Sequence, residues 1–207
     1  MLPPPRAAAV SDPPVLRMTL RDGRPVALRP VVPQDRVRLA EGFEELSQES
    51  RRLRFLGSVS TLSEAQLRYL TEVDGVDHVA WGALDLTQPD APGFGVGRFI
   101  RLGRGSDVAE FSLTVLDTAQ GLGVGQLLLA VLAVVAPTVG VGTLRGVVGR
   151  ENDRMSAWMF RLNAQLVASE PELTLDLRLP VDASVSPSAA EFAETAAQIR
   201  AAMDGEG

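Results

Sequence analysis

The 207-residue sequence contains no cysteine and no lysine, and it has a single histidine, His78. Without cysteine the chain can form no disulfide, no zinc-thiolate site and no thiol nucleophile, which is compatible with a reducing, cytoplasmic setting. One imidazole cannot build a metal site from several histidines, and a Ser-His-acid triad would have to use His78. We therefore expect no metal in the functional site.

Basic charge and long apolar runs are also scarce. The chain carries 20 basic and 26 acidic residues, a net charge of −6, which disfavours a broad electrostatic grip on nucleic acid or anionic membranes. The longest apolar run, residues 127–137, would span only about 15 Å as a helix, whereas a bilayer core measures roughly 30 Å. We expect this run to be a buried helix, and we expect neither a nucleic-acid nor a membrane partner.

Length and composition favour one domain with short appendages. A chain of 207 residues with 45% hydrophobic residues is long and apolar enough to bury a sizeable core. The proline-rich residues 1–14 are expected to form a disordered tail, and residues 15–182 the folded domain. Residues 183–207 are expected to form a C-terminal helix or tail, with an alanine-rich helix over residues 188–203 that lies on the surface or mediates contacts.

The pattern of apolar residues predicts a mixed α/β chain. The turn dipeptide Asp22-Gly23 indicates a hairpin, and helices are predicted to open at residues 33–35 and 62–64. Three β-rich segments then predict an antiparallel meander, and an alternation of helices and strands follows it. The expected architecture is a largely antiparallel sheet flanked by helices, with a single β-α-β crossover. The segments are residues 78–86, 95–102 and 108–116 for the meander, and 121–136 (helix), 143–148 (strand), 153–163 (helix) and 173–179 (strand) after it.

A glycine-rich loop joins the third meander strand to the apolar helix. Gly121, Gly123 and Gly125 allow backbone N–H groups to point outward at a helix start, where phosphate is favoured. A P-loop would need a lysine, which the chain lacks. The dinucleotide fingerprint would need a third glycine where Gln126 or Leu128 stands. The loop therefore predicts an anionic ligand that is neither a nucleoside triphosphate nor a nicotinamide cofactor; the alternative is that these glycines only close a strand-helix junction.

The motif Gln120-x-x-Gly123-x-Gly125 after an apolar strand resembles the cofactor loop of the GNAT superfamily of N-acetyltransferases. The resemblance covers most of residues 28–179, and Asn152 at the start of the following helix is a second match. Residues 28–31, 43–55 and 62–63 resemble the bacterial protein lysine acetyltransferase branch in particular. The resemblance implies an α/β (α+β) mixed-sheet GNAT-like fold, with a central, largely antiparallel sheet flanked by helices and with splayed strands at the cofactor site. It makes residues 15–182 the N-acetyltransferase domain.

The same resemblance implies the site and the reaction. Acetyl-CoA would be the cosubstrate, with its pyrophosphate on the glycine loop and its pantetheine arm along residues 113–115. Glu110 would be the general base for direct transfer of the acetyl group to an amine, of a protein lysine or of a small molecule. Without a cysteine, a covalent acyl-enzyme is poorly supported. The cofactor-binding residues implied in this way are Leu113, Thr114, Val115, Gln120, Gly121, Leu122, Gly123, Val124, Gly125 and Asn152.

Three positions depart from the family pattern. Leu122 stands where the branch often has a cation, Met159 stands where many relatives have a tyrosine general acid, and Asn163-Ala164 replaces a usual Gly-Phe. These departures keep a second hypothesis open, that of a catalytically degenerate acyl-CoA-binding or protein-interaction module. A third, an acyltransferase for an alcohol or for aminoacyl-tRNA, would use the same cofactor site. A homodimer also stays open.

Some charged residues have competing interpretations. Glu110 can be a base, or a strand-end acid in solvent or paired with arginine. Arg51, Arg52 and Arg54 form a basic cluster that either guides an acidic substrate or covers a solvated helix face. His78 is interpreted as a structural histidine and not as a proton shuttle.

Overall fold

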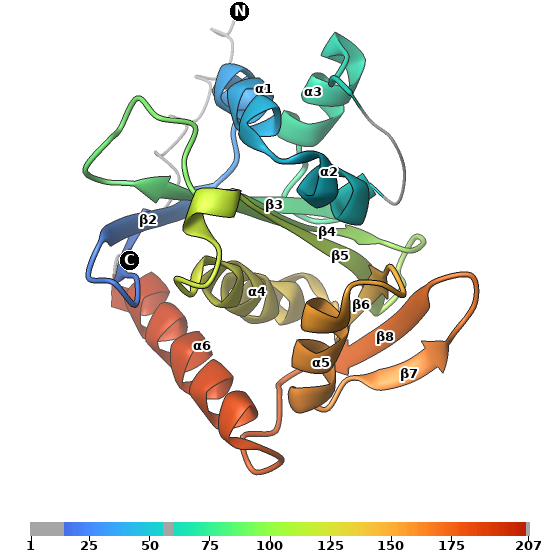
Figure 1. The fold of residues 1–207 in the computed structure, drawn as a ribbon. Coiled ribbons are helices and arrows are strands. Elements are labelled where there is room, and N and C mark those ends of the chain that lie inside the picture. The colour runs from blue at the N-terminus through green and yellow to red at the C-terminus, as the bar shows by residue number, and fades with distance from the viewer. Residues whose placement is uncertain (1–14, 56–59, 206–207) are drawn as a thin grey trace, which may run out of the picture.

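One eight-stranded sheet organises the protein (Figure 1). The computed structural model describes residues 15–55 and 60–205. The strand order is β1-β2-β3-β4-β5-β6-β8-β7, and every neighbouring pair is antiparallel except β5 and β6, which are parallel. This arrangement confirms the expected fold class. The strands are β1 Leu16–Thr19, β2 Pro25–Pro30, β3 His78–Asp85, β4 Gly95–Arg101, β5 Val108–Val115, β6 Thr143–Val148, β7 Gln165–Ala168 and β8 Leu173–Arg178.

Helices cover both faces of the sheet. Helices α1, α2 and α3 lie on one face, whereas α4 and α6 lie on the other, and α5 packs beside β8 (Figure 1). The single crossover, β5-α4-β6, joins the parallel pair and confirms the expected β-α-β unit. The helices are α1 Arg36–Glu45, α2 Gln48–Phe55, α3 Glu64–Thr71, α4 Val124–Val135, α5 Asp153–Arg161 and α6 Pro187–Gly205, with short 3-10 segments at Pro33–Asp35, Asp117–Ala119 and Ala136–Val139.

Helix α4 forms the centre of the core. Apart from Gln126 its side chains are apolar, which is typical of a helix covered on most sides, and nine of its residues are buried. The sheet covers one side, where Leu128 and Leu132 pack over Gly97 of β4. Helix α6 covers another side and buries Phe192 and Ile199. The prediction of a buried helix is confirmed, and within residues 15–55 and 60–205 no helix combines the length and hydropathy needed to cross a membrane.

The sequence patterns missed two elements and misplaced one helix start. Helix α2 is strongly charged. Leu46 takes an extended conformation, which separates α2 from α1. Strand β7 is exposed at all four positions, so it has no alternating pattern to detect. Helix α4 begins at Val124 and not at Gly121, because Gly121 and Gly123 have φ angles of +82° and +94°, outside the helical region.

Candidate active site

The parallel strands β5 and β6 separate along their length. Their ladder runs from Val108 opposite Thr143 to Phe111 opposite Gly146. Residues 112–115 of β5 continue along β4 but have no partner on β6, although β6 runs on to Val148. The expected splay of these two strands is therefore present, and one edge of β5 is open at its carboxyl end.

Glycines hold the backbone closely around this opening. A Cβ atom on Gly95 of β4 would lie 2.4 Å from the carbonyl oxygen of Thr114, so only glycine allows β4 to approach β5 there. A Cβ atom on Gly146 would lie 3.0 Å from the ring of Phe111, which covers the last paired rung. Strand β5 is therefore tightly packed against β4 at Thr114 and against β6 at Phe111, the last residue of their ladder.

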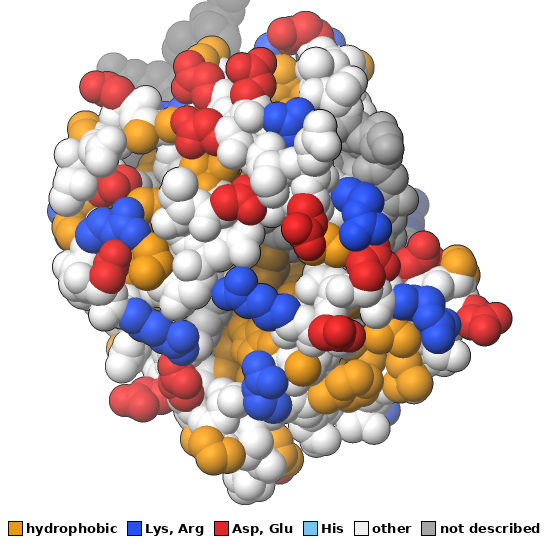
Figure 2. All heavy atoms as spheres, in the orientation of Figure 1, with side chains coloured by type: hydrophobic (Ala, Val, Ile, Leu, Met, Phe, Trp, Pro, Cys, Tyr) orange, Lys and Arg blue, Asp and Glu red, His pale blue; other side chains and the backbone are white. Residues whose placement is uncertain are grey.

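The splayed strands open into a cleft of about 750 Å³. Figure 2 shows this face of the molecule hollowed near its centre, with hydrophobic side chains at the floor and arginines at the rim. Residues from β5, the glycine loop, β6, α2, α5 and α6 line the cleft. Of the ten residues predicted to bind the cofactor, eight line it, namely Leu113, Thr114, Val115, Gln120, Gly121, Gly123, Gly125 and Asn152.

The other two predicted residues have structural surroundings. Val124 is buried in the core, and Leu122 packs against the core while its carbonyl accepts a hydrogen bond from the backbone N–H of Arg21 at 3.1 Å. Gly123 is the N-cap of α4. The unpaired N–H groups of the first helical turn and the positive end of the helix dipole therefore lie at the glycine loop.

Two arginines from distant segments bring positive charge to the loop. The side chain of Arg21, from the β1–β2 turn, would lie 3.6 Å from a Cβ atom on Gly123, and its Nη2 donates to Glu191 of α6 at 2.7 Å. Arg154 of α5 donates from Nη1 to Oε1 of Gln120 at 3.1 Å. Both arginines line the cleft. They supply positive charge near the loop, which Leu122 does not. Neither arginine was predicted to lie at the loop, because nothing near the loop in the sequence indicates it.

Asn152 has a local role as well as a place in the cleft. It is the N-cap of α5, and its Oδ1 accepts a hydrogen bond from the backbone N–H of Met155 at 3.1 Å. This capping bond fixes where α5 begins. Arg154, two residues later, is thereby held at the cleft wall.

A hydrogen-bonded aspartate fastens α2 to the end of β5. The carboxylate of Asp117 accepts bonds from the N–H and hydroxyl of Ser47 at 2.9 and 3.0 Å and from the hydroxyl of Ser50 at 2.8 Å. Burial acts to raise the pKa of Asp117, but these bonds outweigh it and hold the pKa below its usual range. The network fixes the wall of the cleft that faces α5.

Glu110 lies on β5 near the cleft but does not line it. It is exposed and points to the same side of the sheet as Ser112 and Thr114, which do line the cleft. Its negative charge acts on Arg54 and also helps to raise the pKa of Arg145, whose main partner is Asp176. The role of Glu110 as a base stays a prediction. Met159, which stands where many relatives have a tyrosine, is fully buried.

His78 belongs to a buried cluster and does not line the cleft. Its Nε2 lies 3.1 Å from Nη1 of Arg98, and its ring centroid is 5.0 Å from that of Tyr69. Burial, followed by the charge of Arg98, lowers the pKa of His78 to about 4. The imidazole is therefore neutral at pH 7, which agrees with a structural role.

Comparison with known proteins identifies the family. No family model matches the chain. The chain is 38% identical over 169 residues to Acetyltransferase Pat of Mycolicibacterium smegmatis, covering 80% of this chain and 48% of that protein. It is 31% identical over 137 residues to Acetyltransferase PA5475 of Pseudomonas aeruginosa, covering 66% and 73%. The GNAT domain of S. lividans PAT superposes with a TM-score of 0.73 at 28% identity, covering 80% of this chain and 97% of that domain.

The splayed parallel strands and the glycine loop at the start of α4 define a GNAT-type acyltransferase fold. The chain belongs to the GNAT acetyltransferases. It spans about half the length of the M. smegmatis relative.

Proposed function

We propose that the protein is an acetyl-CoA-dependent N-acetyltransferase that moves the acetyl group directly to an amine, either of a protein lysine or of a small molecule. The observation that carries this proposal is the cleft of about 750 Å³ between the splayed strands, with the glycine loop and the start of α4 at one end. Membership of the GNAT acetyltransferases supports the same reaction.

The cleft residues fit the two ends of acetyl-CoA. The N–H groups at the start of α4 suit the pyrophosphate, and Arg21 and Arg154 add charge there. The pantetheine arm is amide-containing and extended, and it suits residues 113–115, whose edge has no ladder partner on β6. The same free edge of β5 offers backbone N–H groups to the thioester carbonyl, where they would stabilise the negative charge that develops on oxygen.

The reaction is a displacement at the thioester carbonyl. The neutral amine attacks the carbonyl carbon, the new C–N bond forms, the C–S bond breaks, and the CoA thiolate leaves. At pH 7 a lysine-like ammonium of pKa about 10.4 must first lose a proton, which costs about 4.6 kcal/mol. In this proposal Glu110 accepts that proton through water at the mouth of the cleft. The nitrogen releases its second proton to solvent as the C–S bond breaks, and the thiolate takes up a proton from solvent.

Acetyl-CoA is expected to raise the thermal stability of the protein. At about 100-fold over its dissociation constant, a ligand of the native state adds about 2.7 kcal/mol, which for a chain of this size raises Tm by roughly 5–10 °C. Thermal unfolding with and without acetyl-CoA measures this, with ATP and NADH as controls that should give no comparable shift. An unchanged Tm at millimolar acetyl-CoA would contradict the proposed cofactor site.

The substitution Arg154→Gln is expected to weaken acetyl-CoA binding about tenfold, the loss of one charge-assisted hydrogen bond to phosphate. Because salt screens this exposed charge, the difference from wild type should shrink at high ionic strength. Isothermal titration at low and high salt gives both numbers. Arg17→Gln, which changes an exposed arginine of β1 away from the cleft, is the matched control. Equal affinities for Arg154→Gln and Arg17→Gln would remove Arg154 from the phosphate site.

A second function, acyl-CoA binding without transfer, rests on two observations. Glu110 lies outside the residues that line the cleft, and Met159 is buried where many relatives have a tyrosine. A protein of this kind would show the rise in Tm with acetyl-CoA but no turnover. The two functions are therefore separated by an activity measurement and not by a binding measurement.

A further inference from the structure

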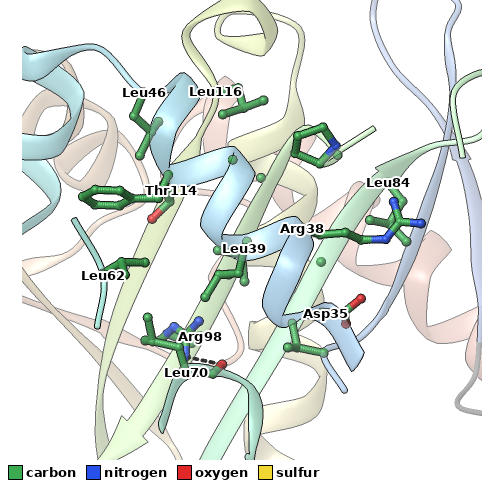
Figure 3. Close-up of a pocket in the computed structure, with 18 of the residues that line it drawn as sticks. Asp35, Arg38, Leu39, Leu46, Leu62, Leu70, Leu84, Arg98, Thr114 and Leu116 are labelled. Carbon is green, nitrogen blue, oxygen red and sulfur yellow. Dashed lines mark hydrogen bonds between the residues drawn. The ribbon is translucent and has the colours of Figure 1, made fainter. Parts of the chain in front are cut away.

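A second cavity lies on the opposite face of the sheet from α4, under helix α1. It measures about 90 Å³, and residues of α1, α3 and the strands β4 and β5 are among those that line it. Figure 3 shows α1 crossing in front of these strands, with Arg98 and Thr114 on the strands beneath it. The cavity and the cofactor cleft share Leu46, Arg54 and Thr114. The cavity and the cleft therefore adjoin each other at these three residues.

The cavity is positively charged within a negatively charged protein. Four arginines and one aspartate line it, whereas the whole chain has a net charge of −6. Arg29 is already paired with Asp35, to which it donates two hydrogen bonds, and Arg38 donates to the backbone carbonyls of Pro89 and Ala91. The other two arginines of the cavity are Arg54 and Arg98.

Arg98 is a buried cation without an acidic partner. Its side chain rises from β4 away from α4, because the neighbouring Gly97 faces Leu128 and Leu132. The residue is only 4% exposed, and Nη1 donates to the carbonyl of Leu70 at 3.0 Å. Within residues 15–55 and 60–205, no carboxylate forms an ion pair with it.

The second arginine brings another positive charge close to Arg98, and the charge of Glu110 acts on this second arginine. Arg54 donates from Nε to the hydroxyl of Thr114 at 3.0 Å, at the boundary between the cavity and the cleft. Burial, followed by the charge of Arg54, lowers the pKa of Arg98 to about 10, which leaves it cationic at pH 7. An uncompensated buried charge is costly. A bound anion would remove that cost.

The remaining lining restricts the form of the anion. Most other side chains in the cavity are aliphatic, and Leu39, Leu62 and Leu70 surround Arg98 and Thr114 (Figure 3). A single water needs 10–15 Å³ on this measure, so about 90 Å³ holds a carboxylate with a short hydrocarbon chain. A guanidinium binds a carboxylate in a planar, two-point geometry.

We propose that this cavity binds the terminal carboxylate of a short-chain substrate, close to Arg98, while the reacting end of that substrate lies in the cleft beside Thr114. The carboxylate can belong to the acyl group, as in a dicarboxylic monothioester of CoA, or to the acceptor, as in an amino acid with a distal amine. The inference deepens the proposed function and rests on it for the place of the reacting end.

Matched ligand pairs test the inference on the wild-type protein. Succinyl-CoA and butyryl-CoA have four-carbon acyl chains that end in a carboxylate and in a methyl group. The amines 4-aminobutyrate and butylamine differ in the same way and are titrated in the presence of CoA. Isothermal titration should show that the carboxylate-bearing member of one pair binds about ten- to a hundredfold more tightly. A preference in the first pair assigns the cavity to the acyl donor, and one in the second pair assigns it to the acceptor.

Two arginine substitutions in β4 test whether Arg98 causes the preference for the carboxylate-bearing ligand. Arg98→Met should reduce the ratio of dissociation constants within the preferred pair to about one. Arg101→Met is the matched control, because Arg101 is on the same strand and its side chain is 6% exposed, but it is paired with Asp77 and does not line the cavity. The ratio in Arg101→Met should equal that of wild type. A ratio is measured within one variant, so a general change in cofactor affinity cancels.

A signal that needs no CoA separates this inference from the proposed function. His78 is the only histidine and lies 3.1 Å from Arg98, so its ring C–H resonances report on the cavity. Free succinate should shift them saturably in wild type. If succinate does so but no CoA ester binds, the proposed function fails and the carboxylate site near Arg98 stands. If acetyl-CoA binds but neither pair shows a preference and succinate shifts nothing, the inference is overturned and the proposed function stands.

Discussion

Replacement of Glu110 by glutamine is expected to lower kcat by about 10²- to 10⁴-fold at pH 7, the usual contribution of a general base. Glutamine keeps the size and polarity of the side chain but cannot accept the ammonium proton. Because Glu110 does not line the cleft, the dissociation constant of acetyl-CoA should stay within about twofold of wild type. Steady-state kinetics of thiol release together with titration of acetyl-CoA separates the two effects.

The pH profile distinguishes a base from a residue with only a structural role. As the pH rises toward the amine pKa of about 10.4, the acceptor loses its proton without help, so the deficit of Glu110→Gln should shrink. A structural defect would give the same deficit at every pH. Glu64→Gln, at an exposed acid of α3 that does not line the cleft, is the control and should match wild type. A deficit of less than threefold at pH 7 would mean that Glu110 is not the base.

Acidification from pH 7 to pH 4.5 is expected to destabilise the protein through His78. The folded protein holds the pKa of His78 at about 4, whereas an unfolded histidine titrates near 6.5. Between these values the unfolded chain binds the proton and the folded chain does not, so the free energy of unfolding falls as pH falls. The shift corresponds to about 3 kcal/mol in total, most of it lost between about pH 6.5 and pH 4.5.

His78 is the only histidine of the chain, so no other imidazole titrates between about pH 6.5 and pH 4.5. The aspartates with lowered pKa values, such as Asp35 and Asp117, lose their stabilising effect only below their ordinary value of 3.8. Urea unfolding at several pH values should therefore give a steep slope for wild type and a nearly flat one for His78→Gln, which keeps a polar side chain next to Arg98. Equal slopes for the two proteins would show that the folded protein does not lower the pKa of His78.

Local patterns predicted the central part of the fold and of the cleft. Gly121, Gly123 and Gly125 predicted a tight loop at the start of a helix, and the loop precedes α4, although the helix begins at Val124 and not at Gly121. The alternating segment over residues 143–148 is strand β6 with the predicted bounds. Such features follow from a few adjacent residues, because turn conformation and strand periodicity are short-range properties.

The charges around the cleft and the cavity could not be predicted in the same way. The bond from Arg21 to Glu191 joins residues 170 positions apart, and the contact of Arg98 with His78 depends on the pairing of β3 with β4. Arg54 was predicted only as part of a basic cluster, and its bond to Thr114 becomes visible once α2 packs on β5. Each contact depends on tertiary packing, which adjacent residues do not encode.

The most direct test of the account is thiol release from acetyl-CoA in the presence of an amine acceptor, with mass spectrometry of the acceptor. The protein contributes no thiol to the signal and has no lysine side chain to be acetylated, because it lacks both cysteine and lysine. We predict that thiol and acetylated amine appear in equal amounts, with a panel of lysine peptides, small amines and amino acids as acceptors. Saturable binding of acetyl-CoA without thiol release above the uncatalysed rate, for every amine tested, would contradict the account and favour a protein that binds acyl-CoA without transferring the acyl group.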